Sequence, residues 1–309
     1  MDVKRASSYV GKALLGLSFA FLFYLLYSLD LSSVFKYFKL SWIPIIALLS
    51  VLFSLFYFLI AYAYDLLLET ITGKKLGRSA IYIYLKTVVL KYAPGNVFHF
   101  LGRHSLVKSD GLEHKEIIFA NSAEIILQLF GVSILLLFGV LVFGFSLDFG
   151  EYLKLSKNNL FLVIGLLLSL VLGILSSKKY RSLLLKKGSL FNIFKVIKLQ
   201  TIFIIGSAST FALVLALFFD HSYSFESFMH TLFIAIIAWF LGFVVPGAPG
   251  GIGIRESVLV LLLPPVLLLS KEVVLAGALI YRVITILGEA LTYFWAKLIK
   301  KGEESESRE

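Results

Sequence analysis

Long apolar segments separated by short polar linkers make up most of the chain. A membrane-spanning helix needs roughly 20 predominantly apolar residues, and most of these segments approach or exceed that length. They are Ala13–Leu29, Trp42–Tyr64, Ile117–Phe145, Asn159–Leu175, Thr201–Phe219, Phe228–Val245, Ser257–Leu269 and Val273–Leu298. The pattern predicts an all-α, polytopic integral membrane helix bundle. We expect a single transmembrane domain over residues 1–300, followed by a charged, disordered cytoplasmic tail at 301–309.

The first apolar segment is open to two interpretations. Lys4 and Arg5 precede Ala13–Leu29, which is compatible with a signal peptide as well as with a first span. No small-residue cleavage site follows the apolar run, so we interpret it as a retained span.

Composition supports a lipid environment and narrows the chemistry. Of the 309 residues, 59% are hydrophobic and 16% charged, against about 25% charged in soluble domains. The mean hydropathy is +0.92. The chain has no cysteine, which excludes disulfides and thiol catalysis. Its net charge of +10 is spread among apolar segments, so nucleic-acid binding is a poor explanation.

The basic residues predict an orientation. The loop Ser176–Lys198 contains lysines and an arginine but no acidic residue, which places it in the cytoplasm. The loop Asp220–His230 contains no lysine or arginine and is expected outside. This assignment places both termini in the cytoplasm and the protein in the cell membrane.

Two segments fit this topology only if they are interrupted. Residues 76–116 must begin and end inside, and they contain Pro94-Gly95. Residues 228–270 can begin and end outside, and they contain the glycine-rich run Pro246–Gly253. We interpret both as re-entrant hairpins, which are tolerated where the irregular backbone is buried in protein or lines a wet cavity. For the second segment, two ordinary spans joined by a cytoplasmic turn fit the charges equally well.

The two segments also resemble each other. Arg103 follows Pro94-Gly95 at the same spacing as Arg255 follows Pro246-Gly247. Further along the chain, a Lys-Glu pair opens a long apolar helix in each case, at Lys115-Glu116 and at Lys271-Glu272. In the expected topology these long helices run in opposite directions, which is typical of inverted-repeat transporters. Coincidence is the alternative, because Pro-Gly is common at turns.

Ionisable side chains inside spans need a partner, a wet cavity or a role. Six such residues stand out: Arg103, Glu124, Arg255, Glu256, Arg282 and Glu289. They can form structural ion pairs between helices, or they can line a path for a polar headgroup or a proton. An arginine beside free helix N–H groups is a natural phosphate clamp, although an arginine can also extend to the interface. Gly250 and Gly251 would let a ligand approach the backbone closely.

These residues carry a family resemblance. Lys91-Tyr92-Ala93-Pro94-Gly95 followed by Leu101-Gly102-Arg103, and the run Pro246–Glu256, resemble the two signatures of the lysylphosphatidylglycerol synthase transmembrane family. Glu124, and Arg282 with Gly288-Glu289, are similar to the helix positions of that family. The resemblance extends from about Lys12 to Lys300. It implies a flippase-like, lipid-handling membrane protein without the aminoacyl-transferase domain.

The leading hypothesis is a translocator of a phosphate-bearing lipid, either a phospholipid or a polyprenyl-phosphate lipid. A non-transporting accessory subunit for a membrane glycosyltransferase is the main alternative. A membrane-embedded enzyme is disfavoured because no catalytic constellation, metal site or cofactor motif is visible. Buried charges that face one cavity would favour transport, whereas charges paired in a dry core would favour the accessory role.

Overall fold

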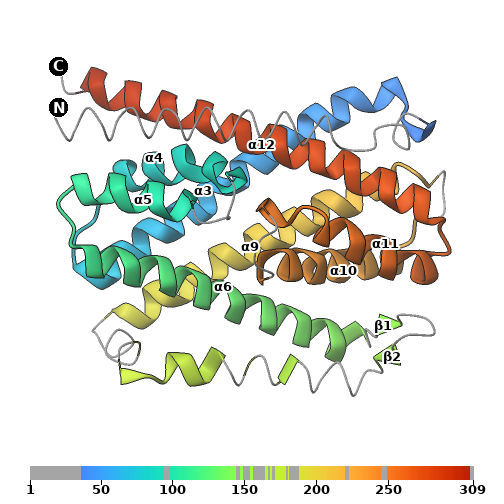
Figure 1. Ribbon diagram of the computed structural model, residues 1–309, viewed down its shortest axis with the longest axis horizontal. Helices are drawn as coiled ribbons and strands as arrows, with labels where there is room; N and C mark the ends of the chain where they lie inside the picture. The colour runs from blue at the N-terminus through green and yellow to red at the C-terminus, as the bar shows by residue number, and fades with distance from the viewer. Residues whose placement is uncertain are drawn as a thin grey trace.

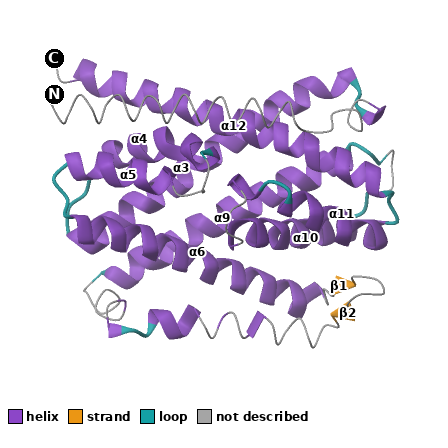
Figure 2. Cartoon of the chain, in the orientation of Figure 1, coloured by secondary structure: helices purple, strands orange, loops and turns teal. Residues whose placement is uncertain are grey.

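The computed structural model describes residues 36–93, 98–143, 147–148, 154–155, 164–165, 168, 171–178, 180, 188–219, 223–244 and 249–306. Helices dominate this part of the chain (Figure 2). The elements are η1 (Leu40–Trp42), α3 (Ile43–Thr72), α4 (Arg78–Thr87), η2 (Val88–Tyr92), α5 (Phe98–Ser109), α6 (His114–Phe143), α9 (Ser189–Ala216), α10 (Phe225–Val244), η3 (Pro249–Gly251), α11 (Ile254–Leu267) and α12 (Lys271–Glu306), with a short antiparallel pair of strands, β1 (Leu147–Asp148) and β2 (Lys154–Leu155). The expectation of a helical bundle is confirmed.

Five helices in the described ranges are long and apolar enough to cross a membrane. They are α3 together with η1, and α6, α9, α10 and α12. Each coincides with one of the predicted apolar spans, which supports a membrane protein. Of the other predicted spans, Ala13–Leu29 and most of Asn159–Leu175 lie outside the described residues, and Ser257–Leu269 corresponds to the shorter helix α11.

Two units consist of a helix, a break and a second helix. In the first, α4 and η2 lead to α5; in the second, α10 and η3 lead to α11. They occupy different halves of the molecule in Figure 1, and η2 packs against η3 where the units meet. Lys74 Nζ donates to the carbonyl of Gly111 at 3.3 Å, so the first unit begins and ends at the same end of the bundle. Re-entrance into a membrane stays a prediction for both units, since α10 is itself long enough to span.

The predicted Pro94-Gly95 and Pro246-Gly247 breaks lie outside the described residues. The long helices that follow the two units run in opposite directions, as Figure 1 shows for α6 and α12. This is the relation that an inverted repeat requires.

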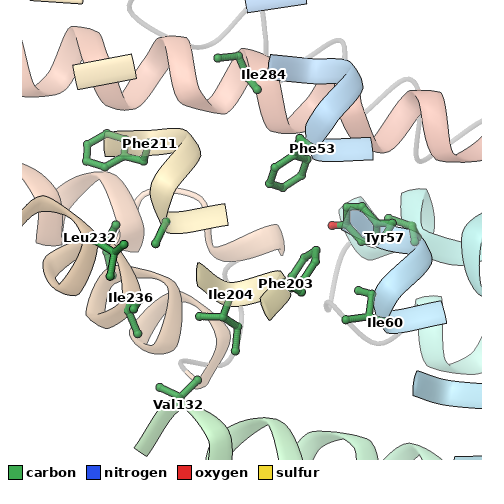
Figure 3. Packing of buried hydrophobic residues seen from close by; sticks show 14 of the residues in the cluster. Phe53, Tyr57, Ile60, Val132, Phe203, Ile204, Phe211, Leu232, Ile236 and Ile284 are labelled. Atoms are coloured by element: carbon green, nitrogen blue, oxygen red, sulfur yellow. The ribbon is translucent and has the colours of Figure 1, made fainter. Parts of the chain in front are cut away.

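The centre of the bundle is packed around α3 and α9, with α12 crossing α3. Figure 3 shows Phe53 and Tyr57 of α3 facing Phe203 of α9, and the rings of Tyr57 and Phe203 meet edge to face at 5.1 Å. Gly288 lets α12 approach α3 closely, because a Cβ there would lie 2.9 Å from the carbonyl oxygen of Ser50. Large apolar side chains on the outer surface remain exposed, as a lipid-facing helix allows.

The end of α12 differs from the expectation. We predicted a disordered tail after Lys300, but α12 continues as helix to Glu306. Lysine and glutamate are good helix formers, so the residues after Lys300 can extend the helix. Charge and polarity alone were therefore insufficient grounds for predicting disorder directly after a long helix.

Candidate functional site

Arg103 and Glu124 form a buried ion pair between α5 and α6. Arg103 Nη1 lies 2.6 Å from Glu124 Oε2, and the two residues are 3% and 6% exposed. The guanidinium group also lies 4.2 Å from the ring centroid of Tyr84, whose hydroxyl donates to Glu124 Oε1 at 2.6 Å. Glu124 therefore faces the protein interior. The charge of Arg103, however, is already compensated by this carboxylate.

A second ion pair fixes the glycine-rich break of the second unit to α12. Arg282 Nη2 lies 2.7 Å from Glu256 Oε1, and Arg282 Nη1 donates to the carbonyl of Gly250 at 3.2 Å. The other carboxylate oxygen of Glu256 accepts the backbone N–H of Gly253 at 2.7 Å, which caps α11. Gly250, Gly251 and Gly253 have φ angles of 60°, 73° and 83°, a region that favours glycine. Arg282 is 4% exposed and faces the protein interior.

A third ion pair joins the first unit to α12. Lys91 Nζ lies 2.6 Å from Glu289 Oε1, which also accepts the hydroxyl of Tyr57 at 2.8 Å. Sequence reasoning singled out Glu289 but assigned no role to Lys91 or Tyr57. Lys91 does stand directly before Tyr92-Ala93-Pro94-Gly95, and that position in the motif was the available signal.

Arg255 is partly buried, and it differs from the cations of these three ion pairs because no described carboxylate lies within ion-pair distance of it. Its Nε is buried and has no hydrogen-bond partner among the described residues. Two glycines make room for the side chain: a Cβ on Gly242 would lie 2.6 Å from Arg255 Cγ, and one on Gly251 would lie 2.7 Å from Nε. The guanidinium carbon lies 5.9 Å from the ring centroid of Trp239.

A cavity of about 400 Å³ brings these features together between the two units. Four predicted site residues line it, namely Arg103, Glu124, Gly250 and Arg255. The other four, Gly251, Glu256, Arg282 and Glu289, do not line it. The rest of the wall combines aromatic and aliphatic side chains with a few polar groups: Tyr57, Ile60, Tyr84, Thr87, Val88, Lys91, His99, Phe100, Ile125, Gln128, Leu129, Phe203, Trp239, Gly242, Phe243 and Val244.

The histidines beside Arg103 lie in different environments. His99 lines the cavity, and its buried Nδ1 has no hydrogen-bond partner among the described residues. His104 lies nearer the surface, where its Nε2 is 2.6 Å from Nδ1 of His114. The described part of the chain contains no group of three or more histidine, cysteine or acidic side chains that could hold a metal ion.

The lining of the cavity suits an anion, because it combines a largely apolar wall with cationic side chains. Arg255 supplies a positive charge that the described structure does not neutralise, and most of the surrounding wall is aromatic or aliphatic. An arginine fork in such surroundings suits phosphate oxygens. The resemblance to the lysylphosphatidylglycerol synthase transmembrane family rests on the sequence motifs alone: no protein-family model, curated protein or solved structure matches the chain.

Proposed function

We propose that this protein moves a phosphate-bearing lipid, a phospholipid or a polyprenyl-phosphate lipid, from one leaflet of the cell membrane to the other. The observation that carries the proposal is Arg255, a partly buried cation without a described carboxylate partner on the wall of a cavity between the two broken units. An uncompensated charge that is even partly withdrawn from water is costly in a membrane protein. A transient anionic ligand would offset that cost.

The position of the cavity suits transport. The tips of the two units meet here, and a Cβ on Gly250 would lie 3.0 Å from the ring of Tyr92. If each unit enters the membrane from its own side, the headgroup site lies where the units meet, near the middle of the bilayer. Movement of one unit against the other would then expose the site to each side in turn. The lipid tails would stay in the bilayer throughout.

The ion pairs support a second candidate, a non-transporting accessory subunit for a membrane glycosyltransferase. Arg103, Lys91 and Arg282 are each bound to a carboxylate, as expected of charges that only join helices. Arg255 is the observation that favours transport over this alternative.

The experiment begins with the lipid. The protein is purified with its native lipids, and mass spectrometry identifies those that remain bound. The bound lipid is then labelled and reconstituted with the protein in liposomes, where a membrane-impermeant quencher reports its movement between leaflets. We expect the wild-type protein to accelerate this movement and Arg255→Gln to return it to the rate of protein-free liposomes.

Two variants sharpen the result. Arg255→Lys keeps the charge but loses the bidentate fork, so it should retain part of the rate. Lys198→Gln removes one positive charge from an exposed position on α9, outside the cavity lining, and should behave as wild type. An unchanged rate in Arg255→Gln would remove the assigned role of Arg255. A correctly folded wild-type protein that moves no lipid would favour the accessory role.

A further inference from the structure

The net charge of the ionisable side chains around the cavity is small. Arg103 is matched by Glu124, Lys91 by Glu289 and Arg282 by Glu256. A proton that moves within one of these pairs leaves the charge of the pair at zero. Arg255, which lines the cavity, then contributes one positive charge that no described carboxylate neutralises.

We infer that the cavity selects a lipid headgroup that carries a single negative charge, such as a phosphodiester, over a diphosphate or a zwitterionic headgroup. The inference rests on the proposed lipid-binding function and narrows its substrate class. One phosphodiester charge would be neutralised by Arg255 and leave every existing ion pair intact. The complex would then cross the membrane with no net charge at the site.

A second negative charge would have no partner. Burying an unpaired charge costs several kcal/mol in an apolar enclosure. The remaining cations on the wall, Arg103 and Lys91, already neutralise Glu124 and Glu289, so a second ligand charge would leave the site with one negative charge in excess even if these cations donated to it.

A zwitterionic headgroup meets the opposite difficulty. Its phosphate could bind Arg255, but its cationic end would enter the same enclosure. The described wall has one carboxylate, Glu124, and both of its oxygens are already used by Arg103 and by the hydroxyl of Tyr84. The geometry therefore leaves a zwitterion with an unmatched positive charge.

The test compares three lipids with the same dioctanoyl tails. They are phosphatidylcholine, which has no net charge, phosphatidylglycerol, which has one negative charge, and diacylglycerol pyrophosphate, which has more than one. Native mass spectrometry measures their competition for the purified full-length protein. We expect phosphatidylglycerol to bind at least about tenfold more tightly than each of the other two, a difference of about 1.4 kcal/mol.

Charge variants make the prediction specific. Arg255→Gln brings the charge to zero and should remove the preference for phosphatidylglycerol over phosphatidylcholine. Glu124→Gln adds one positive charge and should shift the preference toward the pyrophosphate. Glu256→Gln adds the same charge at a more exposed position, and glutamine can still accept the N–H of Gly253, so this variant serves if Glu124→Gln folds poorly. Lys198→Gln controls for total charge and should leave the ranking unchanged.

The outcomes separate the two proposals. If the wild-type protein bound diacylglycerol pyrophosphate as tightly as phosphatidylglycerol, the inferred selectivity for a single negative charge would be wrong, and lipid binding itself would still stand. The same would follow if both glutamate variants folded and kept the wild-type ranking. If the wild-type protein bound neither anionic lipid, both the inferred selectivity for a single negative charge and the proposed function would be wrong.

Discussion

Replacing Glu124 with glutamine removes the carboxylate that lies 2.6 Å from Arg103 while keeping an acceptor for the hydroxyl of Tyr84. Arg103 is 3% exposed, so its charge would remain buried with only aromatic rings beside it. Breaking a buried ion pair by removing one partner costs about 3 to 5 kcal/mol. The rings of Tyr84, Tyr64 and Phe100 stabilise the guanidinium group before and after the change, so we expect a loss near the lower end of that range.

The informative variant is the double substitution Arg103→Met with Glu124→Gln. It removes both charges, keeps the side-chain volume and leaves Tyr84 with a hydrogen-bond partner. Replacing a buried ion pair by an uncharged pair of similar volume is often neutral or stabilising. The double variant should therefore lie within about 1 kcal/mol of the wild type, well below the sum of the two single losses.

The free energy of unfolding in mixed detergent and dodecyl sulfate micelles, followed by circular dichroism, measures all four proteins of this cycle. A double variant as unstable as the sum of the single variants would refute the reasoning, because it would mean that Arg103 and Glu124 act independently.

Three further predictions concern packing, pH and topology. Gly288→Ala places a methyl group 2.8 Å from Phe53 Cδ1 and 2.9 Å from a backbone oxygen of α3, so unfolding experiments should show a loss of about 1 to 3 kcal/mol; an unchanged stability would contradict the close approach of α12 to α3. Burial, together with the neighbouring His114 and Lys108, lowers the pKa of His104, so stability is present above the ordinary histidine pKa of about 6.5 and is lost as the pH falls from there toward the lowered value. The thermal midpoint of the wild type should accordingly fall more than that of His104→Gln on acidification to about pH 5.5, and equal shifts would rule out His104 as the cause. Because the chain has no native cysteine, single cysteines at Ser224 and Lys300 can be labelled in intact cells with an impermeant maleimide, which should modify the first and not the second; modification of both would overturn the predicted orientation.

The spanning helices could be predicted because length and apolar composition decide them locally. Segments such as Trp42–Tyr64 and Thr201–Phe219 need no tertiary information to be recognised, and the spans in α3 and α9 follow them. The end of α12 was mispredicted because Lys300, Lys301 and the following glutamates are compatible with both disorder and helix.

The sequence allowed us to predict several of the residues that form the candidate site, but not which of them pair with one another. Arg103, Glu124, Arg282 and Glu289 stood out because charges inside spans are expensive. Which carboxylate meets which cation depends on helix packing, and Lys91 reaches Glu289 although the two are far apart in the sequence. The space that Arg255 occupies depends on Gly242, which has no side chain there. The sequence alone does not indicate this role, because it follows from the packing of η3 against α10.

Both broken units are attached to one face of α12. Arg282 fastens the second unit and Glu289 fastens the first, and the two residues are seven positions apart, about 10.5 Å along the axis. Thr292 adds a hydrogen bond from its Oγ1 to the carbonyl of Leu85 at 3.1 Å. Helix α12 is thus attached to both units. Rotation of α12 about its own axis would strain both attachments at once. Tilting of α12 about a point between Arg282 and Glu289 would move the two attachments in opposite directions. A displacement that begins at either unit would therefore reach the other through α12 as well as through the contact between η2 and η3.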